Sequence, residues 1–487
     1  MINEENEEFE EFKPLPLSFV GKTAAVVGIG ISNRPLIDFL LAEGASVTAC
    51  DRKTREKLGT FADELEAKGV KLRLGEQYLD GITEQYVFRA PGIRFDKPEF
   101  LAASESGSVI TSEMELFFER CPARIIGITG SSGKTTTTTL ISLLLEAAGK
   151  RVFLGGNIGR SLLPDLDRMT ENDFAVVELS SFQLHTMRRS PDVSVITNIS
   201  PNHLDYHKGM EEYIDAKCNI LRYMPRGGKA VLNLCDPIVS GLRAVAADGV
   251  GIFGFDSSTA PASDAAATVR DGYICCGEEK YLALSDIRIP GHFNVENYMA
   301  ALSAVCAFVT PEQASAVARS FGGVPHRIQL IPTENGVRYY NSSIDSSPSR
   351  TEATLGVFKT GSDPEKEGRL IVICGGYDKK IPYEPLAPVL CRKADAVILT
   401  GATGPVIGKV LDDYFSSGKC PEDCRPEIHP VPLFDDAVKA AHTLAKKGDT
   451  VLLSPASASF DAFENFEKRG ERFAELVRSF SAEDAKK

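Results

Sequence analysis

The chain has 487 residues, which is too long for one hydrophobic core and indicates two to four domains. With 43% hydrophobic and 25% charged residues, it has the composition of an ordinary soluble globular protein. No apolar run approaches the about 18 residues that span a bilayer. The formal net charge of −13 argues against a nucleic-acid partner, since duplex binding needs a large basic surface. It leaves phosphorylated small ligands open, because a few backbone N–H groups bind them locally.

The amino-terminal stretch MINEENEEFEEFK is acidic and polar, the reverse of a secretory signal peptide. We therefore interpret residues 1–18 as a solvated arm and expect a cytoplasmic protein without membrane insertion. The sequence does not determine the oligomeric state, for which we expect a monomer.

The first segment begins with the apolar run TAAVVGIG at 23–30. A polar turn, the helical pattern LIDFLLAEG and a second apolar run, SVTACD at 46–51, follow. This order predicts a strand, a glycine-rich turn, a helix and another strand. The turn GIGISN approaches the dinucleotide-binding pattern G-x-G-x-x-G but has Asn33 at the third glycine. By itself the turn leaves NAD binding and an ordinary turn equally open.

Two further segments repeat this alternation of apolar runs and amphipathic helical patterns. Their strand candidates lie at 174–179, 193–199, 229–234, 369–376, 395–401 and 449–455. Such alternation predicts parallel sheets with crossover helices in all three segments. We therefore expect an α/β fold with domains at 1–114, 115–324 and 325–487.

The turn GSSGKTT, which begins at Gly130, joins a short apolar run to a helical pattern. The usual phosphate loop, G-x-x-x-x-G-K-[ST], would need glycine where this chain has Ile128. Gly130 and Gly133 nevertheless allow the backbone to curl with its N–H groups inward. Lys134 would lie against the terminal phosphates and Thr135 would contact Mg²⁺. The joint occurrence of strand, G-K-T-T and helix favours ATP or GTP binding over an ordinary strand-to-helix turn.

The spacing T-G-x-x-G-K-T resembles the nucleotide loop of the Mur ligases and folylpolyglutamate synthases, and further motifs follow in matching order. These are GGNIG at 155–159, ELSSFQL at 178–184, NISPNHLDYH at 198–207, DAKCNI at 215–220, GHFNVENYMAA at 291–301 and PHR at 325–327. The run LSPASASFDAFENFEKRGERF at 453–473 resembles the Mur ligases that add D-glutamate. The resemblance covers nearly the whole chain after the acidic arm. The Asn-Pro-Arg motif of members that add a diamino acid is missing from the sequence.

Membership of this family would imply a Rossmann-like UDP-binding domain, a central P-loop ATPase-like domain and a carboxy-terminal Rossmann-like domain. It would imply ATP-dependent amide-bond formation between UDP-N-acetylmuramoyl-L-alanine and D-glutamate, through an acyl phosphate, in cytoplasmic peptidoglycan precursor synthesis. The cofactors would be ATP, two Mg²⁺ ions and CO₂, bound as a carbamate on Lys217.

The resemblance also implies residue roles around ATP. The nucleotide would be bound by Gly130, Ser131, Ser132, Gly133, Lys134, Thr135, Thr136, Asn297, His326 and Arg327. The metal ligands would be Thr135, Glu178, His203 and Lys217, and the catalytic residues would be Lys134, His203 and Lys217. Without the resemblance, Lys217 would be interpreted as an exposed helix lysine.

The UDP-sugar would be bound, by the same resemblance, by Ser32, Asp51, Arg52, Gly92 and Asn157. Asp51 ends the strand at which dinucleotide-binding folds keep a ribose-binding acid. The loop RAPGI has Ala90 where the family has serine, which removes one hydroxyl hydrogen bond worth about 1 kcal/mol. The resemblance favours UDP over NAD at this turn.

D-Glutamate would be bound by Ser346, Lys379, Ser459 and Phe466. A lysine and a serine hydroxyl suit its side-chain carboxylate. The stretch NSSIDS departs from the family's N-D-S-K-A-T at Ser342 and Ile344, and Arg350 is a candidate replacement for the missing lysine. Most charges of ENFEKRGERF are interpreted as those of an amphipathic surface helix.

Three alternatives stay open. A folylpolyglutamate synthase is disfavoured because it would have no separate UDP-binding domain of the GIGISN type. A non-catalytic, ATP-switched module would not need a second metal site built from Glu178, His203 and Lys217. A dehydrogenase that uses GIGISN for NAD is disfavoured by the missing third glycine and by the ATP loop.

Overall fold

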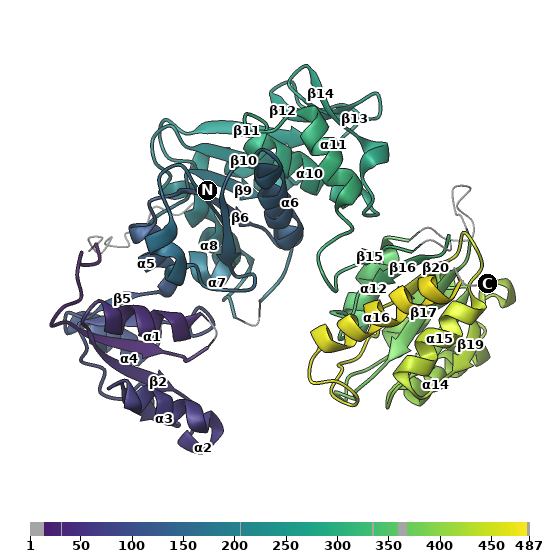
Figure 1. Ribbon diagram of the computed structural model, residues 1–487, viewed down its shortest axis with the longest axis horizontal. Coiled ribbons are helices and arrows are strands. Elements are labelled where there is room, and N and C mark those ends of the chain that lie inside the picture. Colours follow the sequence, from purple (N-terminus) through teal and green to yellow (C-terminus); the bar gives the residue numbers. More distant parts are fainter. Residues whose placement is uncertain (1–13, 31, 205, 334–335, 359–367, 485–487) are drawn as a thin grey trace. The chain divides into compact units, whose positions relative to one another are not determined.

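The computed structural model describes residues 14–30, 32–204, 206–333, 336–358 and 368–484 (Figure 1). The chain forms two compact units, Met1–Leu284 with Val295–Val317, and Ser285–Asn294 with Ala318–Lys487. Most of the predicted acidic arm lies outside the described residues, and the three-domain boundaries stay a prediction. No helix in the described ranges combines the length and the apolar character that a membrane crossing needs.

The first unit begins with a parallel sheet of strand order β3-β2-β1-β4-β5, the order found in dinucleotide-binding folds. Its strands are β1 (Thr23–Val27), β2 (Ser46–Asp51), β3 (Lys71–Leu74), β4 (Tyr86–Arg89) and β5 (Val109–Thr111). Its helices are α1 (Asn33–Ala42), α2 (Arg55–Leu58), α3 (Thr60–Ala67) and α4 (Pro98–Glu105). The strand, turn, helix and strand predicted over 23–51 are confirmed.

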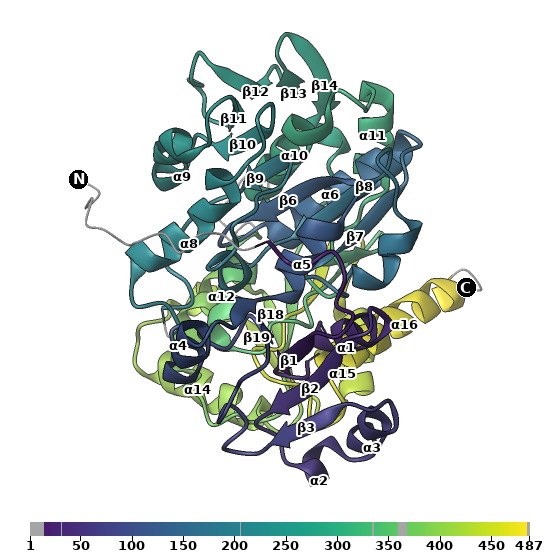
Figure 2. The ribbon, with the colours of Figure 1, turned by 90° about the vertical axis from the view of Figure 1, so that its left-hand side faces the viewer.

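A second sheet follows in the order β14-β13-β12-β11-β10-β9-β6-β8-β7, and Figure 2 shows β12, β13 and β14 at the top of the view with β7 and β8 below them. Its strands are β6 (Arg124–Thr129), β7 (Val152–Gly156), β8 (Phe174–Glu178), β9 (Val193–Ile196), β10 (Lys229–Asn233), β11 (Gly251–Asp256), β12 (Ala265–Arg270), β13 (Tyr273–Cys276) and β14 (Glu279–Ala283). The helices along this stretch are α5 (Glu113–Arg120), α6 (Lys134–Ala147), α7 (Ser181–Leu184), α8 (Met210–Arg222), α9 (Pro237–Gly241), α10 (His292–Val305) and α11 (Pro311–Ser320). Strand β6 lies between β8 and β9, so the carboxyl ends of these three parallel strands meet at one edge.

One end of the second sheet is antiparallel, which corrects the expectation of parallel strands throughout. Strands β12 and β13 pair antiparallel, with Arg270 opposite Tyr273, so only Asp271 and Gly272 form the turn. Both turn residues have positive φ, 51° and 77°. An Asp-Gly pair suits such a two-residue hairpin, and this sequence signal was missed.

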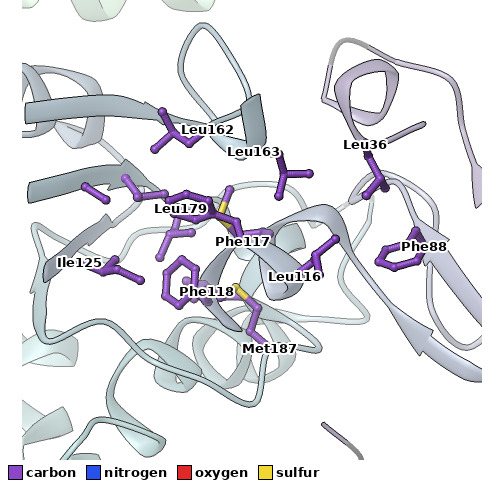
Figure 3. Packing of buried hydrophobic residues seen from close by; sticks show 14 of the residues in the cluster. Leu36, Phe88, Leu116, Phe117, Phe118, Ile125, Leu162, Leu163, Leu179 and Met187 are labelled. Carbon is purple, nitrogen blue, oxygen red and sulfur yellow. The ribbon is translucent and has the colours of Figure 1, made fainter. Parts of the chain in front are cut away.

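Helix α5 joins the cores of the first two sheets. Figure 3 shows Leu116 beside Leu36 and Phe88 of the first sheet region, and Phe118 toward Ile125 of β6. These side chains belong to one continuous cluster of buried apolar residues that runs through both sheets. Alternating apolar positions on α5 therefore bury surface on two sides of the helix.

The second unit contains a sheet of order β15-β16-β20-β17-β18-β19, parallel except for the pair β15–β16. Its strands are β15 (Gln329–Ile331), β16 (Arg338–Asn341), β17 (Leu370–Gly375), β18 (Ala396–Thr400), β19 (Glu427–Pro430) and β20 (Thr450–Leu453). Its helices are α12 (Pro348–Gly356), α13 (Ala387–Lys393), α14 (Gly404–Ser416), α15 (Phe434–Leu444) and α16 (Phe466–Asp484).

The helices of the second unit cover both faces of this sheet. Strand β17 divides its side chains by alternation: Leu370 and Val372 pack with α13 and α14, whereas Ile371 and Ile373 pack with α15 and α16. A strand buried on both faces reads as a continuous apolar run, which is why 369–376 was predictable as a strand. The predicted α/β class is confirmed.

Candidate functional site

The turn that follows β6 is a tight glycine-rich loop at the start of a long helix. Gly130 has φ +151° and Gly133 has φ +81°, and α6 begins at the next residue. A Cβ atom on Gly130 would lie 2.0 Å from the Thr197 hydroxyl oxygen, and one on Gly133 would lie 2.4 Å from Oδ1 of Asn297. Both positions therefore require glycine, and the predicted strand, turn and helix are present.

Residues after β9 hold this loop in shape. The backbone N–H of Ser131 donates to the carbonyl of Asn198 at 2.8 Å, and that of Ser132 donates to the Asn198 side chain at 2.9 Å. The Thr197 hydroxyl donates to the Ser132 carbonyl at 2.6 Å. Because these two loop amides are used within the chain, the N-terminal amides of α6 are the groups suited to an anion. Sequence reasoning gave Thr197 and Asn198 no role and placed both at the end of the predicted strand 193–199, whereas in the structure they directly follow β9.

Lys134 folds back over the loop at the first turn of α6. Its Nζ atom donates to the carbonyl of Gly130 at 2.9 Å and to that of Ser131 at 3.2 Å. Oδ1 of Asn297 accepts from the Thr137 hydroxyl, on the first turn of the same helix, at 3.2 Å. The loop residues and Asn297, predicted together for ATP, thus lie together.

Lys217 is buried against this loop rather than exposed on its helix. It is 1% exposed, and its Nζ atom donates to the Thr129 hydroxyl at 3.2 Å and to the Gly130 carbonyl at 3.0 Å. Burial lowers the pKa of Lys217 well below its usual range, and the nearby charge of Lys134 lowers it further, while Glu178 acts in the opposite direction. The neutral, nucleophilic form of the amine is therefore more accessible here than in an exposed lysine.

Glu178 stands at the carboxyl end of β8, the neighbour of β6, and is 3% exposed. Its Oε1 atom accepts from the Asn157 side-chain amide at 2.7 Å. Its Oε2 atom is buried and has no hydrogen-bond partner among the described residues. A buried, unsatisfied carboxylate oxygen is costly in free energy, and a cation beside the loop would satisfy it.

His203 lies on the exposed turn after β9, with a positive φ of 55°. Its ring packs edge-on against Phe182, with 4.9 Å between ring centroids. Its metal role stays a prediction.

The turn after β1 is closed by two polar side chains of the first sheet region. Asp51 accepts hydrogen bonds from the backbone N–H of Ile29 at 2.7 Å and of Lys53 at 2.8 Å. Asn33, the residue at the third glycine position, donates from its side chain to the carbonyls of Val27 and Gly28, at 3.3 and 2.8 Å. Asn33 thus stabilises the turn through its side chain, which a glycine could not do.

The remaining residues predicted for the UDP-sugar are accessible. Ser32 is half-buried before α1, and Arg52 is exposed beside Glu76, 3.4 Å from its carboxylate. Gly92 and Asn157 are exposed. These roles stay predictions.

The second unit gathers the residues predicted for D-glutamate near the ends of β17 and β20. The backbone N–H of Tyr377, two residues before Lys379, donates to the Ala458 carbonyl at 2.9 Å, next to Ser459. The Ser343 hydroxyl, three residues before Ser346, donates to the Phe466 carbonyl at 2.8 Å. Segments far apart in the chain therefore converge here.

A buried arginine that sequence reasoning missed ties these segments together. Arg469 is 2% exposed and donates to the hydroxyl and carbonyl of Ser343, and to the carbonyls of Ser457 and Ala458, at 2.9 to 3.0 Å. Burial lowers the pKa of Arg469 to about 10, so it stays protonated at neutral pH. The other charges of ENFEKRGERF are exposed or half-buried, as expected for a surface helix, and Arg469 is the exception. Its spacing from the buried Phe473 and Val477 on α16 was the available signal.

His326 and Arg327, predicted for ATP, lie before β15 in the second unit. His326 has φ +63°, and its ring lies edge-on to Phe466, with centroids 6.1 Å apart. Burial lowers the pKa of His326, and Arg327 is exposed. Their contact with a nucleotide stays a prediction.

Known proteins are similar to this chain over most of its length. A family model described as the Mur ligase middle domain matches residues 128–305, and one described as the Mur ligase, glutamate ligase domain matches 326–457. A UDP-N-acetylmuramoylalanine–D-glutamate ligase of Acetivibrio thermocellus is 47% identical over 466 residues, which cover 95% of this chain and 97% of that protein.

Solved structures share the fold. The UDP-N-acetylmuramate-alanine ligase MurC of Thermotoga maritima has a TM-score of 0.56 and 18% identity, covering 94% of this chain and 99% of that one. The MurF ligase of Thermotoga maritima, solved in complex with ADP, has a TM-score of 0.53 and 17% identity, covering 95% of each chain. The resemblance seen in the sequence is confirmed, and the chain belongs to the Mur ligase family.

Proposed function

We propose that this chain is an ATP-dependent ligase that joins D-glutamate to UDP-N-acetylmuramoyl-L-alanine, a step in peptidoglycan precursor synthesis. Its 47% identity over 95% of the chain to a ligase of that name supports the choice of substrates. The structural observation that carries the proposal is the burial of Glu178 and Lys217 beside the glycine-rich loop. A non-catalytic ATP switch would not need this pair.

The reaction couples two displacements. A carboxylate oxygen of the UDP-sugar substrate attacks the γ-phosphorus of ATP, and the bond to the β-phosphate oxygen breaks to release ADP. The free amine of D-glutamate then attacks the acyl carbon of the acyl phosphate. The amide forms as the bond from the acyl carbon to the phosphate oxygen breaks, releasing phosphate, and the amine loses its proton.

The chain's own groups supply charge complementarity for the phosphates. The N-terminal amides of α6 face an anion with the positive end of the helix dipole, and Lys134 extends from the same turn to neutralise the phosphoryl oxygens. Asn297 accepts from Thr137 and packs against Gly133, so it also supports the loop. The helix amides that a phosphoryl group would meet here are already in place, which lowers the cost of reorganisation.

The residues present fit a divalent cation, because Oε2 of Glu178 is a buried oxygen that needs a partner. Thr135 and Glu178 would hold a first Mg²⁺, and His203 with Lys217 a second. Bound there, Mg²⁺ would neutralise the charge of the transferring phosphoryl group. Lys217 itself is cationic or neutral, so it needs conversion to an anion before it favours a metal.

A carbamate on Lys217 is the conversion that the environment supports. The amine attacks the carbon of CO₂, the N–C bond forms, and one amine proton is lost, leaving an anion. This reaction requires a neutral amine, which the lowered pKa of Lys217 favours.

The amino acid would be held in the second unit by Ser346, Lys379, Ser459 and Phe466. Lys379 is exposed and offers a charge to the side-chain carboxylate, and Arg469 orders the segments around it. The exposed Arg350 donates to the Ile344 carbonyl at 3.1 Å, so it reaches the segment in which the family's lysine is missing.

The test is phosphate release by the purified protein with ATP, Mg²⁺ and UDP-N-acetylmuramoyl-L-alanine, with D-glutamate compared against a panel of amino acids. We expect release that depends on D-glutamate, with a product heavier by one glutamyl residue. Release with another amino acid would keep the ligase chemistry and overturn the amino-acid assignment. ATP binding without release under any condition would favour a non-catalytic module.

A further inference from the structure

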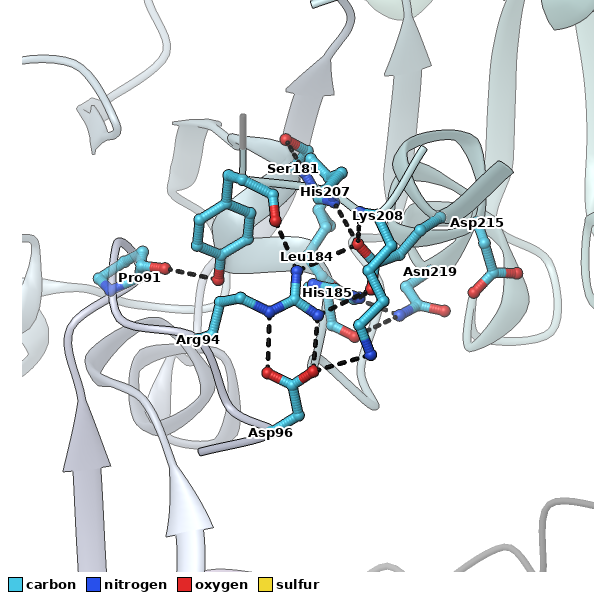
Figure 4. A network of polar contacts seen from close by, with 12 residues as sticks. Pro91, Arg94, Asp96, Ser181, Leu184, His185, His207, Lys208, Asp215 and Asn219 are labelled. Carbon is cyan, nitrogen blue, oxygen red and sulfur yellow. Dashed lines mark hydrogen bonds and ion pairs between the residues drawn. The ribbon is translucent and has the colours of Figure 1, made fainter. Parts of the chain in front are cut away.

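A single arginine side chain connects three segments of the first unit (Figure 4). Arg94 follows the turn Ala90–Ile93 at the end of β4. Its guanidinium donates to both oxygens of Asp96 at 2.8 Å, to the carbonyl of Tyr206 at 2.6 Å, and to both oxygens of Glu212 at 2.9 and 3.2 Å. These bonds use the five N–H donors of an arginine completely.

The turn beside Arg94 is also bonded to the central part of the unit. The Tyr206 hydroxyl donates to the Pro91 carbonyl at 3.2 Å, and the Arg94 guanidinium lies 5.3 Å from the centre of the Tyr206 ring. Arg89 donates from Nη2 to the Thr186 hydroxyl at 3.1 Å. The turn that carries Gly92 is thus anchored on both sides.

One partner of Arg94 in the central part lies on the turn of a predicted catalytic group, and the other lies on the helix that carries a second one. Tyr206 belongs to the turn that carries His203, and the backbone N–H of Tyr206 donates to the His203 carbonyl at 3.1 Å. Glu212 and Lys217 are on the same helix, α8 (Met210–Arg222). Because a helix turn is stiff, a displacement of Glu212 displaces Lys217 as well.

Glu212 is occupied by protein donors rather than poised for a cation. Besides Arg94, its Oε2 accepts from the backbone N–H of Lys208 at 2.7 Å. His185 and His207 lie 3.7 and 3.4 Å from its oxygens, an arrangement that resembles a metal site. The guanidinium charge on the same carboxylate opposes a metal ion there, which favours a structural link.

We propose that Arg94 is a positioning residue that couples the substrate turn at residues 90–93 to the His203 turn and to helix α8. The proposal rests on the proposed function, which makes Gly92 a UDP-sugar contact and Lys217 part of the phosphate site. A substrate that orders the turn at 90–93 thereby orders the groups around the phosphates. This link is partly buried, with Arg94 21% and Glu212 20% exposed, so solvent screens it less than a surface pair.

The kinetic test compares Arg94→Ala, Glu212→Ala and the double variant in steady-state assays. We expect each single variant to raise the KM for the UDP-sugar about tenfold and to lower kcat, and the double variant to be no worse than either single. The KM for D-glutamate stays unchanged, because its predicted residues lie in the second unit. Arg94→Lys keeps the charge but has three donors in place of the planar fork, so it restores activity only in part.

The matched control is Arg55→Ala, which removes an exposed ion pair of the same sheet region. Arg55 lies 2.6 Å from Asp63 and 2.7 Å from Glu66, and it does not touch the substrate turn. We expect wild-type KM and kcat. A uniform loss of active protein at unchanged KM in Arg94→Ala, or additive effects in the double variant, would overturn the proposal.

Hydrogen exchange tests the link without turnover. In Arg94→Ala, peptides from the turn at 90–96 and from the start of α8 should both exchange faster than in the wild-type protein, and Arg55→Ala should leave both unchanged. Faster exchange confined to 90–96 would overturn the coupling. If the wild-type protein forms no product, the proposed function fails, and this comparison still decides whether Arg94 couples the two segments.

Discussion

The amine of Lys217 lies 3.0 Å from the carbonyl oxygen of Gly130, the first glycine of the phosphate-type loop. A lysine of helix α8 therefore packs directly against the loop. Because Lys217 is only 1% exposed, the neighbouring groups of the site, and not bulk water, determine its protonation state.

The first prediction concerns the chemistry of Lys217. We expect a carbamate carbonyl resonance in ¹³C NMR spectra of the protein in ¹³C-labelled bicarbonate, and its loss in Lys217→Met. This variant keeps the apolar stem but has no amine, so ligase activity should be lost while ATP still binds. Lys150→Met, at the exposed residue after α6, is the control that should keep the resonance. A wild-type spectrum without the resonance would refute carbamylation.

The second prediction concerns metal dependence. Glu178→Gln keeps an oxygen for the Asn157 amide but removes the negative charge, so the Mg²⁺ concentration for half-maximal activity should rise about tenfold or more. Chelation of Mg²⁺ should abolish activity reversibly. Glu146→Gln, at an exposed position near the end of α6, should leave the Mg²⁺ dependence unchanged. An unaltered Mg²⁺ titration of Glu178→Gln would remove Glu178 from the metal site.

The third prediction separates backbone strain from steric fit in the loop. Gly133→Ala introduces a Cβ 2.4 Å from Oδ1 of Asn297 at φ +81°, whereas Gly149→Ala meets nothing within 4 Å at φ +72°. Both variants should lose about 1 kcal/mol of unfolding free energy from the positive φ. Only Gly133→Ala should also weaken ATP binding, by at least about tenfold. Calorimetric titration with ATP checks this, and equal affinities would show that the contact with Asn297 does not matter.

The fourth prediction concerns pH. Burial raises the pKa of Glu113 on α5 from 4.5 to about 7, against the effect of the Ser161 hydroxyl that donates to it. Between these values the folded protein holds a proton that the unfolded chain has released, so stability falls as the pH rises through this window. Glu113→Gln should remove this loss, gaining up to about 3 kcal/mol above pH 7 relative to the wild-type protein and little below pH 4.5.

Denaturant unfolding at a series of pH values measures this effect. Burial also raises the pKa of Glu115 to about 7, so the stability of Glu113→Gln should still fall with pH, but less than that of the wild-type protein. Glu105→Gln, at the exposed last residue of α4, is the control and should follow the wild-type curve. A constant difference between Glu113→Gln and the wild-type protein at all pH values would contradict the assignment.

The fifth prediction concerns Arg469. Arg469→Lys keeps a charge but loses the fork that bonds Ser343, Ser457 and Ala458, so the KM for D-glutamate should rise about tenfold with the KM for ATP unchanged. Arg469→Met leaves several buried carbonyls unsatisfied and should cost about 3 kcal/mol of stability. Arg472→Met, one turn further along α16 and half-exposed beside Asp435, should change neither value. A change in the KM for ATP alone would refute a role at the amino-acid site.

The local pattern of the sequence was sufficient for most elements around the site. Strands β1, β6 and β8 are short, mainly apolar runs, and α6 has regular helical spacing between two glycines. Their types therefore follow from the spacing of apolar residues and from the glycines that bound them. The hairpin at Asp271–Gly272 was also readable from its turn residues but was overlooked because alternating βα units dominate the rest.

Other parts of the site could not be read from local pattern. The burial of Lys217 depends on α8 packing beside the loop after β6, a contact between residues 87 positions apart. Arg94 looks like a surface charge because nothing nearby in the sequence indicates the carbonyl and carboxylates that surround it. Helical spacing from Phe473 and Val477 indicates that Arg469 is buried, but it does not indicate the carbonyls that Arg469 binds. Only the family resemblance gave Lys217 a role, and it gave none to Arg94 or Arg469.

The shared core around α5 has a consequence for how the chain folds. Leu116 contributes to a cluster that also contains Phe88 of the first sheet and Ile125 of the second. A fragment cut at the predicted boundary of 114 would leave Leu36 and Phe88 without this cover, and burying one such side chain is worth about 2 kcal/mol. The first two sheets should therefore melt in a single cooperative transition, and the amino-terminal segment should aggregate when produced without α5.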